Sequence, residues 1–224
     1  GYWILLGGTA LLSMLISGTL KSKFKKYSQV PVRLTGAQVA EAMLRQNGIQ
    51  DVQVLHVPGQ LTDHYDPIKK TVNLSEPVYQ ANTVAAAAVA AHECGHAVQH
   101  KEAYAWLTFR SKMVPAVQFA SQMMNILMWM MILGAFAFQS PIFIWIFLGA
   151  MGVTTLFSIV TLPVEFDASR RALAWLETSG TTVQMEHGQA KDALFWAAMT
   201  YVAAAVAAIA QLAYWIFVLM GRRD

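Results

Sequence analysis

Residues 83–107 read TVAAAAVAAHECGHAVQHKEAYAWL, a stretch with many alanines, one glycine and no proline. Alanine has the highest helix propensity, so this stretch predicts one long helix. Within it, residues 92–96 have the pattern HExxH, which places His92 and His96 one turn apart on the same face. Two imidazole nitrogens in that arrangement can bind one metal ion. Glu93 lies about 100° round the helix, where it can reach a water in an open coordination position.

Long uncharged runs dominate the rest of the chain, which has 224 residues, 56% of them hydrophobic and 13% charged. Such a composition excludes a soluble single-domain enzyme, and an uncharged run of about 20 residues is long enough to cross a bilayer. The sequence predicts four membrane-spanning helices, at residues 2–20, 113–138, 142–162 and 194–220. Polar residues in the first half of the second run would have to face protein or water. A tight turn at residues 139–141 would join the second span to the third.

The positions of the basic residues predict the orientation of these helices across the membrane. Four lysines between residues 21 and 26 follow the first run at once, and most other basic residues lie in segments 21–112 and 163–193. Positive charge is retained on the cytoplasmic side, so both segments are expected there. Because the lysines follow the first run, it is expected to be a retained anchor and not a signal peptide. The lipid bilayer is the expected partner, and no nucleic-acid-binding module is present.

The polar segment before the HExxH stretch predicts a small α+β unit. Residues 35–38 have the form of a capping box, and the apolar pattern that follows stops at Asn47-Gly48, which predicts one amphipathic helix. Two short extended runs, at residues 52–56 and 71–74, predict a small sheet, with a turn around Asp66-Pro67. The run 72–75 is either a plain core strand or an edge strand on which an extended peptide could add.

The HExxH pattern needs a third protein ligand, and the known spacings narrow the choice. A metzincin would have glycine and histidine where this chain has Gln99 and Glu102, and the Asp-Gly pair of site-2 intramembrane proteases is absent from the sequence. A downstream carboxylate remains. Glu165 lies at the predicted cytoplasmic end of the third span, on the same side as His92, and two histidines with one glutamate are typical of a catalytic zinc site.

Two other carboxylates compete with Glu165 for this role. Asp167 is spaced to pair with Arg171, and Glu177 is placed like a solvated residue near a helix end. The motif around Glu165, LPVEFDASRR at residues 162–171, favours Glu165, and its proline is expected to begin a helix.

Three further residues near the motif have two interpretations each, and the single cysteine has one. His100 continues the histidine spacing and either lines the cleft as a hydrogen-bond donor or is an ordinary neighbour of the site. His64 and Tyr65 flank the predicted turn and either bind the oxyanion or the substrate backbone, or are solvated. Cys94, the single cysteine, cannot form an internal disulfide and is expected to be a small packing residue and not a ligand.

Several motifs taken together resemble a known family. HECGHAVQH follows LTDHYDP at residues 61–67 and LSEPVY at residues 74–79, and precedes LPVEFDASRRAL. This combination is similar to the YugP-type membrane-embedded neutral zinc metallopeptidases of bacteria, over essentially the whole chain. More distantly, the segment around Glu165 resembles that of HtpX-type and CAAX prenyl proteases, in which an aspartate follows the ligand glutamate after four residues.

The resemblance implies specific roles. His92, His96 and Glu165 would be zinc ligands, and Glu93 would be the catalytic base. In this chain Ser169 replaces the aspartate of the distant relatives, and it would orient a metal-bound histidine by a weaker hydrogen bond. The implied activity is that of a gluzincin-like peptidase in the bacterial cell membrane.

The sequence therefore predicts a mainly α membrane protein of about four transmembrane helices with a small α+β metallopeptidase insertion. The expected function is zinc-dependent endoproteolysis of membrane or misfolded proteins near the cytoplasmic surface, with one catalytic zinc ion. The alternative is a non-catalytic zinc-binding membrane scaffold or regulator, and a regulatory subunit or an oligomer is compatible with either. The expected segments are 1–20 (first span), 21–112 (cytoplasmic α+β segment), 113–162 (hairpin of spans), 163–193 (cytoplasmic helix with the third ligand) and 194–224 (last span and tail).

Overall fold

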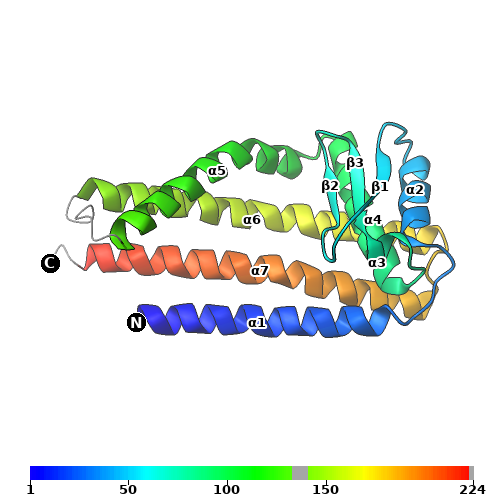
Figure 1. Cartoon of the computed structure of the whole chain (residues 1–224), viewed down its shortest axis with the longest axis horizontal. Coiled ribbons are helices and arrows are strands. Elements are labelled where there is room, and N and C mark those ends of the chain that lie inside the picture. The colour runs from blue at the N-terminus through cyan, green and yellow to red at the C-terminus, as the bar shows by residue number, and fades with distance from the viewer. Residues whose placement is uncertain (133–140, 222–224) are drawn as a thin grey trace.

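The fold was analysed in a computed structural model of the chain, which describes residues 1–132 and 141–221. Its helices are α1 (Tyr2–Tyr27), α2 (Gly36–Gln46), α3 (Glu76–Tyr79), α4 (Val84–Lys101), α5 (Ala105–Ile132), α6 (Pro141–Thr178) and α7 (Gln184–Met220). Its strands are β1 (Gln53–Val57), β2 (His64–Asp66) and β3 (Thr71–Ser75). Three long helices, α1, α6 and α7, lie side by side, and the small α/β unit sits at one end of them (Figure 1).

The long helices are the membrane candidates. Among the described residues, α1, α6 and α7 are long and apolar enough to cross a membrane. α1 begins and α7 ends at the end of the bundle remote from the sheet (Figure 1). At 1.5 Å per residue, the 37 residues of α7 extend about 55 Å, well beyond a hydrocarbon core of about 30 Å. Both α6 and α7 are therefore long enough to cross a bilayer and still extend beyond it to pack against α4 of the α/β unit.

The expected count of four spans is wrong for the described part of the chain. α5 covers most of the predicted second span but contains Arg110 and Lys112, and its polar residues 118, 121, 122 and 125 lower its hydropathy. Residues 133–138 of that predicted span, and most of the predicted turn at 139–141, lie outside the described residues. α5 runs at a slant along α6, from the sheet end towards the far end (Figure 1).

Pro163 does not begin a helix, contrary to the sequence prediction. It lies inside α6, which is continuous for 38 residues. A proline removes one backbone hydrogen bond, but α6 packs against α4, α5 and α7, and these contacts hold it in helical conformation. Glu165 therefore shares one helix with the third span, about 36 Å from the start of that helix.

The sheet has the order β1-β3-β2, with β1 parallel and β2 antiparallel to β3. The two predicted strands are present as β1 and β3, whereas β2 falls on residues expected to flank a turn. All five residues of β3 are buried between the outer strands. The interpretation of residues 72–75 as an edge strand is therefore wrong, and β2 is one of the two outer strands.

Two helices fix the α/β unit around the motif. α2 has the predicted capping box, in which Thr35 and Gln38 each accept a hydrogen bond from the other's backbone N–H. α2 packs against α4, whose alanine-rich N-terminal half is buried. The predicted long helix ends at Lys101, earlier than expected, because Ala103 adopts a left-handed φ of 50° and Tyr104 N–H donates to Gln99 O at 2.9 Å. α5 then starts in a new direction.

Candidate metal centre

α4 supplies two of the three candidate ligands. His92 and His96 lie one turn apart, and their ring centroids are 4.8 Å from each other. His96 is buried and His92 is partly buried, so both imidazoles are held within the protein and not in open solvent. Helical geometry alone sets this spacing.

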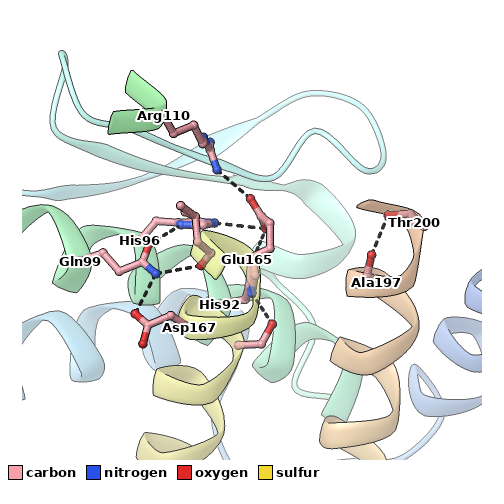
Figure 2. Close-up of polar contacts among 10 residues, drawn as sticks. His92, His96, Gln99, Arg110, Glu165, Asp167, Ala197 and Thr200 are labelled. Carbon is pink, nitrogen blue, oxygen red and sulfur yellow. Dashed lines mark hydrogen bonds and ion pairs between the residues drawn. The ribbon is translucent and has the colours of Figure 1, made fainter. Parts of the chain in front are cut away.

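Glu165 of α6 supplies the third candidate ligand. Its Oε2 lies 3.2 Å from His92 Nε2 and 3.6 Å from His96 Nε2, and its side chain is almost fully buried (Figure 2). One ligand atom from each residue lies within 4.8 Å of the others. Tetrahedral zinc with bonds of about 2.1 Å separates neighbouring ligand atoms by about 3.4 Å. The two histidines and Glu165 therefore fit a zinc ion with little rearrangement.

The electrostatics of this cluster favour a cation. Burial of His96 lowers the pKa of its imidazole, but the hydrogen bond and negative charge of Glu165 outweigh burial and leave that pKa above its ordinary value. A buried carboxylate between two imidazoles attracts either protons or a metal ion. Metal binding would displace the protons, because zinc coordinates neutral imidazole.

A buried glutamine orients His96. Gln99 Oε1 lies 3.0 Å from His96 Nδ1, and Gln99 Nε2 donates to Val164 O at 2.8 Å and to Asp167 Oδ2 at 2.9 Å (Figure 2). This chain of contacts fixes the ring that would bind metal through Nε2. It also ties α4 to α6 directly beside Glu165.

The competing carboxylates lie elsewhere. Asp167 accepts from Gln99 and, at 2.6 Å, from Arg171 Nε, so the predicted pair with Arg171 is present and Asp167 is outside the ligand cluster. Glu177 is exposed near the end of α6 and does not join the cluster either. The structure thus brings together His92, His96 and Glu165, as the motif predicted.

Two further side chains touch the ligands. Ser169 Oγ lies 3.1 Å from His92 Nδ1, on the opposite edge of the ring from Glu165. Arg110 of α5 donates from Nη1 to Glu165 Oε1 at 2.8 Å, which leaves Oε2 towards the histidines (Figure 2). Arg110 was not anticipated from the sequence, since no local pattern links a residue of α5 to one of α6.

Gly95, inside the motif, allows α4 and α6 to approach closely. A Cβ atom at this position would lie 2.6 Å from the backbone oxygen of Ala168, a distance that real Cβ atoms do not adopt. The neighbouring Cys94 faces the other way, buried with its thiol 3.6 Å from Ala40 O, and burial raises the pKa of that thiol. Cys94 therefore occupies a packing position, and Gly95 sets the distance between the two halves of the site.

A cavity of about 540 Å³ opens onto the cluster, and we call it the polar cavity. Glu93 and the three candidate ligands line it, together with His64, Tyr65 and His100. Tyr65 OH lies 2.8 Å from His100 Nδ1, and burial, with the charges of Asp51 and Asp66, raises the pKa of Tyr65 to about 12. The phenol therefore stays protonated at neutral pH and can donate a hydrogen bond.

Three residues of the site were not predicted from the sequence. Gln99 could have been found from its position one turn after His96, whereas Arg110 and Tyr201 come from other helices and carry no local signature. Tyr201 of α7 lines the polar cavity. It also lines a second cavity of about 120 Å³ that reaches His92, Glu93 and Glu165 from the side of α1 and α7.

Comparisons with known proteins identify a family and a relative that the chain resembles. A model of the family described as "putative neutral zinc metallopeptidase" matches residues 2–220. The "putative membrane protease YugP" of Bacillus subtilis (strain 168) is 40% identical over 207 residues, which cover 92% of this chain and 90% of that protein. No solved structure matches the chain. The matched region runs from α1 to α7 and includes both halves of the site.

Proposed function

The chain belongs to this family of zinc metallopeptidases, and we propose that it is a membrane-embedded zinc endopeptidase with Glu93 as its catalytic base. The observation that carries the proposal is the convergence of three ligand atoms, from His92, His96 and Glu165, within 4.8 Å at the wall of an open cavity. Three protein ligands leave one coordination position open, which distinguishes catalytic from structural zinc sites.

The proposed chemistry divides between the ion and the side chains. Zinc bound to this cluster would polarise the scissile carbonyl and lower the pKa of a water molecule. Glu93 lies in the polar cavity beside the ligands, where its carboxylate takes a proton from the attacking water. Glu93 then gives that proton to the leaving amine, so that the carboxylate is regenerated after each turnover.

The opposite wall of the cavity supplies hydrogen-bond donors for the oxyanion that develops on the scissile carbonyl. Tyr65, held by its contact with His100, stays protonated, and His64 lines the same wall from β2. Donors preorganised at that position commonly contribute a factor of about 100 to 1,000 in rate. We assign this role to Tyr65, whose O–H is free to donate when the Nδ1–H of His100 donates to the phenol oxygen. His64 Nδ1 lies 2.7 Å from Thr62 O and its Nε2 lies 3.3 Å from the Asn73 amide, so His64 shapes this wall and does not donate to the oxyanion.

The position of β2 suggests how a peptide binds. β2 pairs with β3 on one side only, within the part of the chain that the structure describes, and its residues line the polar cavity. An extended peptide added along its outer edge would pass the ligand cluster and continue in both directions. Such a path suits cleavage within a chain, and therefore an endopeptidase.

The membrane helices suggest where substrates come from. Glu165 lies about 36 Å along α6, slightly more than the thickness of a hydrocarbon core, and this length supports a site near a bilayer surface. The lysines at residues 21–26 lie in the last turns of α1, at the end of the bundle where the sheet lies (Figure 1). Positive charge is typical of the cytoplasmic side of a membrane protein. We therefore propose that the substrates are membrane proteins, their juxtamembrane segments or misfolded chains at the cytoplasmic surface.

The test is cleavage mapping of a peptide library by mass spectrometry, with the zinc-loaded full-length protein and two variants. Glu93→Gln should keep zinc and lose turnover by about 100-fold to 10,000-fold, because the amide cannot accept the proton. Glu177→Gln, an exposed change at the end of α6, should behave as the unaltered protein does. Full turnover by Glu93→Gln would reject the assigned base.

The same experiment tests the alternative function. If the unaltered protein holds zinc and cuts no peptide, the endopeptidase proposal fails. The non-catalytic zinc scaffold would then be the better account of the cluster.

A further inference from the structure

A second, smaller cavity meets the reaction centre from the side of α1 and α7. Its volume is about 120 Å³, and it shares His92, Glu93, Glu165 and Tyr201 with the polar cavity. We call it the apolar cavity, because most of its remaining wall is hydrocarbon. That wall consists of Phe24, Val89, Ser169, Leu194, Ala197 and Ala198.

Four helices build this wall. Phe24 comes from α1 and Val89 from α4, one turn before His92, while Leu194, Ala197 and Ala198 follow one another along α7. Ala197 lies on α7 across from Glu165 (Figure 2). Ser169, the one hydroxyl outside the shared residues, is already beside His92 Nδ1. Among the residues that the structure describes, only those of the reaction centre bring a charged side chain to this cavity.

The α1 and α7 walls are fastened to each other. Asp192, just before Leu194 on α7, accepts a hydrogen bond from Tyr27 and lies 2.7 Å from Lys23 Nζ. These contacts lie one turn from Phe24, so the part of α1 that faces the apolar cavity is held in place. The cavity is therefore a formed site and not a loose gap between two membrane helices.

We infer that the apolar cavity is a specificity pocket that receives an aliphatic side chain of the substrate, from one of the two residues that flank the scissile bond. This inference rests on the proposed endopeptidase activity. A general base must lie within hydrogen-bond reach of the water that attacks the scissile carbonyl. A side chain that enters a pocket lined by Glu93 therefore belongs to a residue next to that carbonyl.

The chemistry and the size of the pocket select the residue. A carboxylate group in this cavity would lose its hydration and face the negative charges of Glu93 and Glu165. An ammonium group would also lose its hydration, and the only carboxylates in the described lining are those two, which are committed to the reaction centre, so charged residues are disfavoured. With about 30 Å³ for each water-sized group, a volume of about 120 Å³ holds about four such groups. A leucine or isoleucine side chain has four carbon atoms. An indole ring is too large.

Two substitutions on α7 change the pocket in opposite directions. Ala198→Leu would fill it, and Leu194→Ala would enlarge it; both residues are buried. Ala204→Leu is the matched control, because Ala204 is exposed on the same helix and does not line either cavity. Each protein is tested on peptides that differ only at the residue the unaltered enzyme selects next to the cut, with zinc content measured in parallel.

The expected result is a reciprocal change of preference. Ala198→Leu should lower kcat/KM for the leucine peptide on the order of 10-fold or more and spare the alanine peptide. Leu194→Ala should raise kcat/KM for the phenylalanine peptide relative to leucine by a similar factor. Ala204→Leu should match the unaltered enzyme on every peptide.

Other outcomes separate the two hypotheses. If the unaltered enzyme cuts peptides but both pocket variants keep its preference, the apolar cavity does not select substrate, while the peptidase assignment stands. If the unaltered enzyme cuts nothing, the proposed function fails and the pocket assignment fails with it. Should Ala198→Leu lose its zinc, the leucine side chain has disturbed the site, and the Leu194→Ala preference alone decides.

Discussion

His92 and His96 come from neighbouring turns of α4, whereas Glu165 comes from α6 and lies 73 residues further along the chain than His92. The geometry of one helix fixes the spacing of the histidines, whatever surrounds that helix. The position of Glu165 depends on how closely α6 packs against α4. The first half of the centre is therefore set locally and the second half by tertiary contacts.

Three of those tertiary contacts lie directly beside the ligands. Gly95 lets the α6 backbone approach at Ala168, and Gln99 donates to the backbone oxygen of Val164 next to Glu165. Arg110 holds the carboxylate from the α5 side. Each contact can be removed separately, so the dependence of the α6 half on packing can be measured one contact at a time.

Removing the α6 ligand should have the largest effect on the metal. Glu165→Gln replaces a charged oxygen ligand by a weak neutral one, and zinc affinity should fall by more than about 100-fold, beyond the usual range for residues that only support a ligand. Glu177→Gln is the matched control, because Glu177 is exposed on the same helix and lies outside the ligand cluster. Competition with a chromophoric chelator measures both. An equal loss in the two variants would mean that Glu165 is not the third ligand.

Moving α6 away from α4 without changing a ligand should have the next largest effect on zinc affinity. Gly95→Ala places a Cβ atom 2.6 Å from Ala168 O, and such overpacking costs about 1–3 kcal/mol of the free energy of unfolding. Gly188→Ala is the control, because no described residue has an atom within 4 Å of a Cβ there, and it should stabilise α7 by about 0.5–1 kcal/mol. Thermal unfolding and zinc titration report the two consequences. A stable Gly95→Ala protein with normal zinc affinity would show that α6 needs no close approach.

The same division explains what the sequence could predict. The HExxH helix, the capping box at Thr35 and the strands β1 and β3 depend on local patterns, and the structure contains all of them. Glu165 was predicted from the motif around it and not from its distance to the histidines, because the local sequences of α4 and α6 do not show how closely the two helices pack. Arg110 and Tyr201 were missed for the same reason.

The errors also have physical causes. Pro163 was expected to begin a helix, but packing on three sides holds α6 continuous through it. The single helix expected through residue 107 ends at Lys101, because Ala103 turns into the left-handed region. β2 was not predicted, and its residues His64 and Tyr65 were expected to flank a turn. Three residues are too few to show an alternating pattern, and the pairing of β2 with β3 is not visible in the local sequence.

Cutting the glutamine bridge should weaken zinc binding without unfolding the protein. Gln99→Leu keeps the buried volume but leaves His96 Nδ1 and the Val164 carbonyl without their partner, so zinc affinity should fall about 10-fold to 100-fold. Gln184→Leu, an exposed change at the start of α7, is the control. Chelator competition and the melting temperature are measured together. Unchanged zinc affinity in Gln99→Leu would show that the helix alone orients His96.

The smallest effect is expected at Ser169, and it allows a test in both directions. The hydroxyl near His92 Nδ1 makes one neutral contact, so Ser169→Ala should lower zinc affinity only about 5-fold, the equivalent of about 1 kcal/mol. Ser169→Asp should raise the affinity instead, because a carboxylate makes the imidazole a better ligand. If both variants bind zinc as the unaltered protein does, the α6 half acts through Glu165 alone. A loss in the first and a gain in the second would mean that α6 also tunes a histidine of α4.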